Sequence, residues 1–168
     1  TRQAPQGSSG TAVATLDLCA LRYPSEAKRR ARLQILYAPP TGAPAVSNEV
    51  VQYAKGGAAQ AMREIASAVR RCPTKPVEVN GGTISYRVTR ITGAGMPAGS
   101  VALSIRLTAK GQGQTQVLRA VIVFVRKGDT LSGVYVYNGG DAARLALAQA
   151  LSSASAAKLK QSVGGQVA

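Results

Sequence analysis

The sequence predicts an α+β fold: a single domain in which a largely antiparallel sheet of about six strands packs against two main helices. Three observations predict it. The chain has 168 residues, which is enough for one substantial hydrophobic core. Several segments alternate apolar and polar residues as half-buried strands do, and two segments repeat apolar residues at the helical spacing. Their order is strand, strand, helix, four strands and helix, which is typical of α+β proteins.

The two ends of the chain differ in composition from the rest. Residues 1–10 are polar and rich in Gly, Ser and Pro, and residues 164–168 are similarly poor in core-forming side chains. Such segments bury too little surface to offset the entropy that is lost when they become ordered. We therefore expect a flexible leader, one domain over residues 11–163 and a loose tail.

Residues 29–37 form the first expected strand, because apolar residues alternate there with Arg30, Arg32 and Gln34. We expect the apolar face of this strand to be the buried one: Ala31, Leu33, Ile35 and Tyr37. A loop rich in Pro and Gly ends the strand, and residues 48–54 form the second.

The first expected helix follows a Gly-Gly pair that frees the backbone to turn. Its apolar residues between Ala58 and Val69 fall on one stripe of about three turns. Pro73 cannot continue a helix, because it lacks the amide hydrogen that the next turn needs. Cys72 is therefore expected at the helix end.

Four strands are expected after this helix. Residues 83–91 and 100–108 alternate as half-buried strands do. Residues 117–125 are apolar on both sides, as in a central strand that is covered on both faces.

Gly128 and Asp129 suit a two-residue hairpin turn that joins this strand to the last one. The turn would place four valines on one face and four larger residues on the other: Val121, Val123, Val134 and Val136, and Ile122, Phe124, Tyr135 and Tyr137. The second expected helix starts at Asp141, which can cap it. Its apolar stripe includes Leu145, Ala148, Leu151 and Leu159.

The two cysteines, Cys19 and Cys72, lie far apart in the sequence and belong to no CxxC motif. Because the chain has no histidine, they are too few ligands for a zinc site. The alternatives are two buried thiols and one disulfide, and we expect the disulfide. It would tie the segment before the first strand to the end of the first helix, and it would place the protein in an oxidising compartment.

Four stretches, SNEVVQYAKGGAAQAMREIASAVRRCP, VALSIRLTAK, LRAVIVFVRKGDTLSGVYVY and ARLALAQALSSASAAKLK, together resemble the extracellular sensor domain of PknH-type serine/threonine kinases and the related actinobacterial sensor-domain lipoproteins. The resemblance implies an extracytoplasmic domain with a strongly curved antiparallel sheet, helices against it and a cleft for an unidentified ligand. The chain departs from the kinase domains, which carry a second disulfide and a tryptophan in the helix before the cysteine. It also has no kinase catalytic loop and no membrane-spanning run. A free-standing secreted or lipid-anchored protein of the cell envelope fits better, and the sequence does not decide whether a signal peptide or lipid anchor precedes Thr1.

Lysine and arginine number 21 against 7 acidic residues, which gives a formal net charge of +14 at pH 7. Most of these cations must therefore be solvated or face an anionic partner. The densest basic patch is either the solvated end of a strand or an anion-contact site: Lys28, Arg29, Arg30 and Arg32. Nucleic acid is not an expected partner, because the aromatic residues are few and no nucleic-acid-binding motif occurs.

The composition also limits the chemistry. Without histidine, the chain cannot assemble a Ser-His-Asp or Cys-His system or a His-ligated metal. The acidic residues are spread singly among the expected elements, and the glycine pairs lack the spacing of nucleotide-binding loops. We therefore expect a non-catalytic binding or sensor-like domain without a cofactor or a metal.

The candidate ligand-binding residues interrupt the apolar pattern of the expected strands: Arg87, Arg106, Arg119, Tyr86, Tyr135 and Tyr137. The alternative for each tyrosine is a core ring with its hydroxyl at the edge, and for each arginine an exposed position on the sheet. Whether Arg106 and Arg119 share a face depends on the hairpin register across KGQGQT, which the spacing alone does not fix. The expected partner is an unidentified small ligand or an anionic envelope component, with peripheral membrane association as an alternative.

Overall fold

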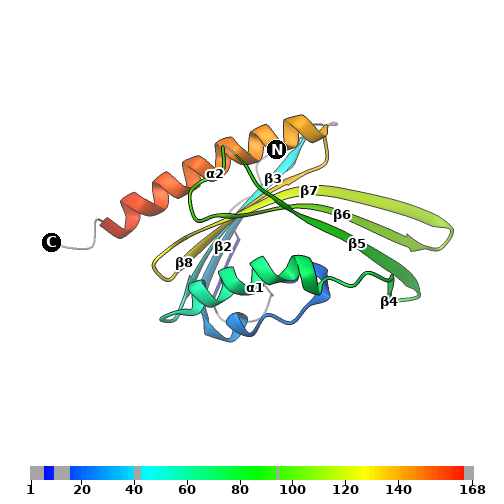
Figure 1. Cartoon of the computed structure of the whole chain (residues 1–168), viewed down its shortest axis with the longest axis horizontal. Coiled ribbons are helices and arrows are strands. Elements are labelled where there is room, and N and C mark those ends of the chain that lie inside the picture. The colour runs from blue at the N-terminus through cyan, green and yellow to red at the C-terminus, as the bar shows by residue number, and fades with distance from the viewer. Residues whose placement is uncertain (1–5, 10–15, 40–42, 94, 165–168) are drawn as a thin grey trace.

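The computed structural model describes most of the chain: residues 6–9, 16–39, 43–93 and 95–164. They form one strongly twisted antiparallel sheet with a helix on each face, α1 (Gly57–Arg71) and α2 (Asp141–Gly164) (Figure 1). Two 3-10 helices pack beside α1, η1 (Leu18–Ala20) and η2 (Pro24–Lys28). None of the described helices is long and apolar enough to span a membrane.

The strand order across the sheet is β1-β2-β3-β8-β7-β6-β5-β4. The strands are β1 (Gln6–Ser9), β2 (Arg29–Tyr37), β3 (Ala45–Tyr53), β4 (Val77–Val79), β5 (Gly82–Ile91), β6 (Val101–Gly111), β7 (Gln114–Lys127) and β8 (Thr130–Tyr137). The α+β class, the antiparallel sheet and its two helices are therefore confirmed. Among the described residues there are eight strands rather than about six, because the short strands β1 and β4 extend the two edges.

Strand β1 lies where the sequence predicts a flexible leader over residues 1–10. Gln6–Ser9 pair with β2, from Gln6 opposite Gln34 to Ser9 opposite Ala31. Backbone pairing at a sheet edge needs no apolar side chains, so the composition of this segment does not reveal it. The remaining residues of that leader, and residues 165–168 of the expected tail, lie outside the described residues, while residue 164 ends α2.

The hairpin of β7 and β8 has the predicted register, with Val123 paired to Val134 and Ile122 paired to Tyr135. Its faces enter two separate cores on opposite sides of the sheet. The core under α1 contains Ile122 and Phe124, together with Ile65 from the helix. The core under α2 contains four buried valines of this hairpin: Val121, Val123, Val134 and Val136. The hairpin is the central part of the sheet, covered on both faces.

Strand β2 has the predicted bounds, but the prediction of its buried face is wrong. Leu33 and Tyr37 are 47% and 50% exposed, respectively. Arg32, on the opposite face, instead forms an ion pair with Glu49, which is 2% exposed. The apolar face lies on the α2 side of the sheet, where α2 packs on β7 and β8 and leaves β2 uncovered. Alternation identifies a strand, but it does not show which of its faces another element covers.

Candidate anion-binding site

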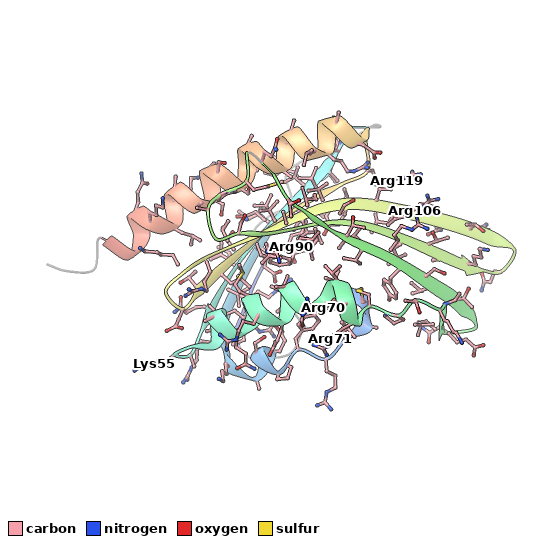
Figure 2. All side chains as sticks on the ribbon, viewed as in Figure 1. Lys55, Arg70, Arg71, Arg90, Arg106 and Arg119 are labelled. Carbon is pink, nitrogen blue, oxygen red and sulfur yellow. A yellow bond between two sulfur atoms is a disulfide. The ribbon has the colours of Figure 1, made fainter. Side chains whose placement is uncertain are left out.

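Three arginines form a row across three neighbouring strands. Arg87 of β5 pairs with Arg106 of β6, and Arg106 pairs with Arg119 of β7. Directly paired side chains point to the same face, with Cβ atoms roughly 5 Å apart. This face is the α2 side, because Arg119 lies two and four residues before Val121 and Val123 of the core under α2 and therefore points to the same face of β7. We call these residues the arginine row; Figure 2 shows Arg106 and Arg119 next to each other near the first turn of α2.

The arginine row has no carboxylate partner in the part of the chain that the structure describes. The ion pairs found there involve other arginines, namely Arg29, Arg32 and Arg144. All three side chains of the row are exposed. Like charges that face each other across paired strands are destabilising, by up to about 1 kcal/mol for each pair. An anion between the guanidinium groups would remove this repulsion.

A hollow of about 400 Å³ adjoins the arginine row. Arg106 and Arg119 line it from the sheet, and Asp141, Arg144 and Leu145 line it from the first turns of α2. The amino terminus of a long helix carries a partial positive charge that attracts anions. Positive charge from the strands and from the helix terminus therefore meets on one concave surface, where the Asp141 carboxylate is paired with Arg144.

Arg144 holds the start of α2 in place and leaves one donor without a partner. Its Nη1 donates to the carbonyl oxygens of Asn138, at 3.0 Å, and Gly139, and its Nη2 pairs with Asp141. The residue is 5% exposed, and its Nε–H is buried without a hydrogen-bond partner among the described residues. A buried unpaired donor beside a hollow is unusual, because leaving such a group unsatisfied costs roughly 1–3 kcal/mol.

Guanidinium groups recognise phosphate, sulfate and carboxylate through paired N–H donors in a fixed plane. Arg106 and Arg119 of the row, together with Arg144, place such donors around one hollow, so the arrangement suits an anionic group rather than a neutral one. The described residues contain no cluster of three or more histidine, cysteine or acidic side chains that could hold a metal ion.

Replacing Arg106 with glutamine should raise the free energy of unfolding by about 0.5–1 kcal/mol in low-salt buffer without multivalent anions. Arg106 is the central residue of the row, so its removal ends both like-charge contacts. The gain should shrink at about 1 M salt, where the screening length is roughly 3 Å. Urea unfolding at both salt levels measures it, with Arg90→Gln as the control because Arg90 is exposed on the other face of β5. A loss of stability in the Arg106→Gln protein would show that the row is not repulsive.

The three candidate tyrosines lie on the other face of the sheet, so the structure does not bring them together with the arginine row. Tyr135 packs edge-on against Phe124, at 5.8 Å between ring centroids, and stacks on Tyr137 at 6.2 Å. The Tyr135 hydroxyl donates a hydrogen bond to Glu49 at 3.2 Å. Tyr86 is half-buried and points to the same face of β5 as Val88. Tyr135 and Tyr137 pack against the core under α1, which is the alternative that the sequence left open for them.

The buried tyrosines predict a loss of stability at alkaline pH. Burial is the main cause that raises the pKa of Tyr23 and of Tyr137 to about 12, above the ordinary value of 10.0. The folded protein therefore keeps these phenolic protons where the unfolded chain has lost them. Their contribution to stability is fully present below about pH 10 and is lost as the pH rises through the folded-state value.

Urea unfolding at a series of pH values should therefore show stability falling between about pH 10 and about pH 12, with phenolate absorbance rising as the protein unfolds. Because the chain has no histidine, no such slope is expected between about pH 6 and 8. Phenolate absorbance that is complete in the folded protein by about pH 10.5 would contradict the burial of these rings.

The predicted basic patch is divided between the interior and the surface. Arg29 is 5% exposed and pairs with Glu26 at 3.2 Å, and Arg32 pairs with Glu49. Lys28 and Arg30 are exposed. Two of its four cations are therefore neutralised inside the protein, and the idea of a four-residue anion-contact patch is wrong.

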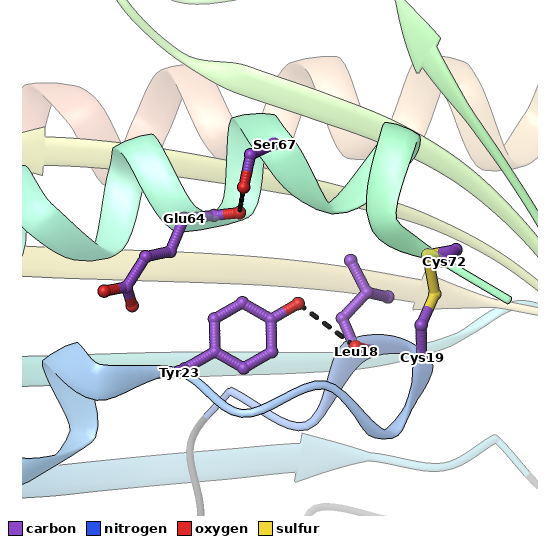
Figure 3. The surroundings of a disulfide bond; sticks show 6 residues. All are labelled: Leu18, Cys19, Tyr23, Glu64, Ser67 and Cys72. Atoms are coloured by element: carbon purple, nitrogen blue, oxygen red, sulfur yellow. Dashed lines mark hydrogen bonds between the residues drawn. A yellow bond between two sulfur atoms is a disulfide. The ribbon is translucent and has the colours of Figure 1, made fainter.

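The predicted disulfide is present and joins Cys19 to Cys72, with Cα atoms 5.3 Å apart (Figure 3). It connects η1 to the end of α1. The neighbouring Tyr23 hydroxyl donates to the carbonyl oxygen of Leu18 at 3.1 Å, as Figure 3 shows. The disulfide and this hydrogen bond fix the segment before β2 onto the helix.

Glu64 of α1 also fixes this segment. Its carboxylate accepts hydrogen bonds from the hydroxyl and the backbone amide of Ser25, at 2.6 and 3.2 Å. Ser25 is fully buried and Glu64 is half-buried, so a part-buried polar contact joins α1 to η2. Nothing in the spacing of the sequence indicates a pair 39 residues apart.

Sequence reasoning missed Arg144 and the contribution of Asp141. The signal that could have indicated them is the acidic residue followed three positions later by arginine at a helix start, a spacing that brings the two side chains onto one face. The prediction that Asp141 starts the helix is confirmed, but its carboxylate binds Arg144.

No family model and no curated protein matches the chain. Among solved structures, the fold is similar to that of the extracellular domain of PknH from Mycobacterium tuberculosis, with a TM-score of 0.58 and 14% sequence identity. The match covers 96% of this chain and 84% of that one. At this identity the similarity shows a common fold and no more. It therefore supports the resemblance of the four sequence stretches only as a resemblance in fold.

Proposed function

We propose that this chain is a non-catalytic, extracytoplasmic domain that binds an anionic ligand through the arginine row and its adjoining hollow. One observation carries the proposal. Three like charges are paired across adjacent strands without a carboxylate partner among the described residues, beside a hollow that also contains Arg144 and the start of α2. An arrangement that costs stability without a ligand and gains it with one is typical of a binding site.

Two observations support an extracytoplasmic location. The Cys19–Cys72 disulfide is of a kind that persists in oxidising compartments. The similar fold of known location is an extracellular domain. We extend this to a secreted or lipid-anchored protein of the cell envelope, where phosphate-rich polymers and lipid headgroups are the abundant anions.

The absence of histidine supports binding without catalysis, since the common nucleophile and general-base systems cannot be assembled from this chain. The arginine row itself offers donors and positive charge but no nucleophile. Its chemistry is therefore recognition of an anion.

Calorimetric titration with pyrophosphate at low salt tests the proposal. We expect binding that weakens steeply as salt rises past physiological strength, where the screening length is about 8 Å. Replacing Arg106 and Arg119 together with alanine should weaken binding at least about tenfold, because charge-assisted hydrogen bonds contribute roughly 1.5–3 kcal/mol each. The matched control is Arg70→Ala with Arg71→Ala, which removes two exposed arginines from the end of α1 (Figure 2).

Parallel titrations with phosphatidylglycerol vesicles and with a soluble glycerol-phosphate polymer distinguish a membrane surface from a wall polymer as the source of the phosphate. Equal weakening by the two double variants would contradict a dedicated site, because it would show that only net charge matters. If no anion binds at low salt, the net positive charge of the protein serves only its solubility, and the proposal is overturned.

A further inference from the structure

A long apolar groove lies on the other side of α2 from the arginine row. It consists of two adjoining hollows of about 430 and 520 Å³, both lined by Tyr37, Val46 and Leu151. We call it the α2 groove. Its floor comes from β2, β3 and β8, and its wall comes from residues of α2 between Leu147 and Leu159. Each hollow is within the usual size range of small-molecule sites, roughly 300–1,000 Å³.

The α2 groove exists because the apolar face of β2 is not covered by α2. Ile35 and Tyr37 line it, and Leu33 on the same face is 47% exposed. Several neighbouring large apolar side chains in contact with water are unusual in a monomeric protein and mark a binding surface. The groove follows about three turns of α2, a length of roughly 18 Å at 1.5 Å per residue.

Two polar side chains of the groove, Asn48 and Ser155, have hydrogen-bond partners within the protein. Asn48 Nδ2 donates to Ser132 Oγ and to the carbonyl oxygen of Gly133, both at 3.0 Å. The Ser132 and Ser155 hydroxyls are hydrogen-bonded to each other at 2.8 Å. The backbone of β3 is paired on both sides, and its hydrogen bonds lie in the plane of the sheet rather than toward the groove.

A ligand in this groove would therefore find apolar contact but few hydrogen-bond partners. A peptide would bury backbone amides and carbonyls without partners, at a cost of roughly 1–3 kcal/mol for each group. A hydrocarbon chain has no such groups. One cation, Lys158, is exposed on the α2 wall of the groove, so an acidic head group at that position would be complementary in charge.

We propose that the α2 groove binds the hydrocarbon chain of a single-chain acidic lipid, a long-chain fatty acid taken up as a monomer, with its carboxylate at Lys158. This is a second site, distinct in residues and chemistry from the arginine row. It does not depend on the function proposed above, because no residue lines both the groove and the hollow beside the row.

Titration of the full chain with fatty acids of increasing length, below their aggregation limits, tests the proposal. Palmitate should bind with one molecule per chain, and affinity should rise with chain length by up to roughly fourfold per methylene group until the groove is filled. Tyr37→Asp should weaken palmitate binding at least tenfold. Val117→Asp is the matched control, because Val117 is an exposed apolar residue on the same sheet face, remote from the groove.

Further variants separate the contribution of the hydrocarbon chain from that of the head group. Ala154→Trp fills the groove without adding charge and should reduce binding, whereas Ala146→Trp, at an exposed position of α2 outside the groove, should not. Lys158→Gln should weaken palmitate binding severalfold but leave methyl palmitate unaffected. The Arg106→Ala and Arg119→Ala protein should keep full palmitate binding, which distinguishes failure of this proposal from failure of the anion site.

Three outcomes would overturn the proposal. A palmitate affinity that does not change with Tyr37→Asp or Ala154→Trp would show that the hydrocarbon chain binds outside the α2 groove. A dimer in sedimentation velocity that Tyr37→Asp dissociates would show that a second copy covers the groove. Binding to lipid bilayers without binding to monomeric fatty acid would make the groove a membrane-contact surface.

Discussion

Replacing Cys19 and Cys72 with serine should lower the free energy of unfolding by about 4 kcal/mol. The disulfide closes a loop with a sequence separation of 53 residues, and a cross-link over such a loop removes much of the freedom of the unfolded chain. Cys19 and Ala20 also adopt left-handed backbone angles, with φ of 62° and 54°, which residues other than glycine rarely hold without support. Loss of the cross-link should therefore also loosen η1.

Urea unfolding of the oxidised protein and of the serine variant measures the difference, and the reduced wild type should match the variant. Hydrogen exchange should show the added mobility first in η1 and at the end of α1, which the disulfide joins. A loss below about 1 kcal/mol would indicate that the Glu64–Ser25 contacts and the core under α1 hold the segment without the disulfide.

Replacing Arg32 alone with methionine should destabilise the protein by about 3–5 kcal/mol, because it leaves the Glu49 carboxylate buried without its guanidinium partner. The Glu49 and Arg32 side chains are only 3% and 11% exposed, so water cannot replace the lost partner easily. The Tyr135 hydroxyl, which donates to Glu49 at 3.2 Å, is too weak to balance a buried charge.

The double variant Arg32→Met with Glu49→Met should recover most of this loss, since two apolar residues can replace a buried ion pair at little cost. Denaturant unfolding of both single variants and the double variant gives the coupling energy between the two residues. Recovery should be incomplete, because Tyr135 loses its acceptor. Additive losses in the double variant would show that the ion pair does not account for the stability of this part of β2 and β3.

The alternating pattern predicted most strands and both helices, because local side-chain spacing is enough to identify an element. It also predicted the register of β7 and β8, since Gly128, with φ of 57°, permits one tight turn between them. The burial of β2 could not be predicted in the same way. Which face of a strand is covered depends on where a helix more than 100 residues later crosses the sheet, and local spacing carries no information about that position.

The arginine row shows the same limit in the candidate site. The sequence identified Arg87, Arg106 and Arg119 separately, but their alignment depends on the turn between β6 and β7. In the structure this turn is centred on Gln112 and Gly113, with φ of 49° and 72°, so that Gly111 pairs with Gln114. Two glycines in KGQGQT allow more than one such turn, and a slip by one residue would move Arg119 to the opposite face. The hollow at the start of α2 could be predicted only from the complete fold, because its lining residues come from β5, β6, β7 and α2.

Arginine side-chain signals in nuclear magnetic resonance test the anion site most directly. Titrating the protein with pyrophosphate at low salt should shift the Nε–H signals of Arg106, Arg119 and Arg144 at one common midpoint. The signals of Arg70 and Arg71, which are exposed at the end of α1, should remain in place. Shifts spread evenly over all exposed arginines, or a signal of Arg144 that does not move, would contradict the assignment of this surface as a specific anion site.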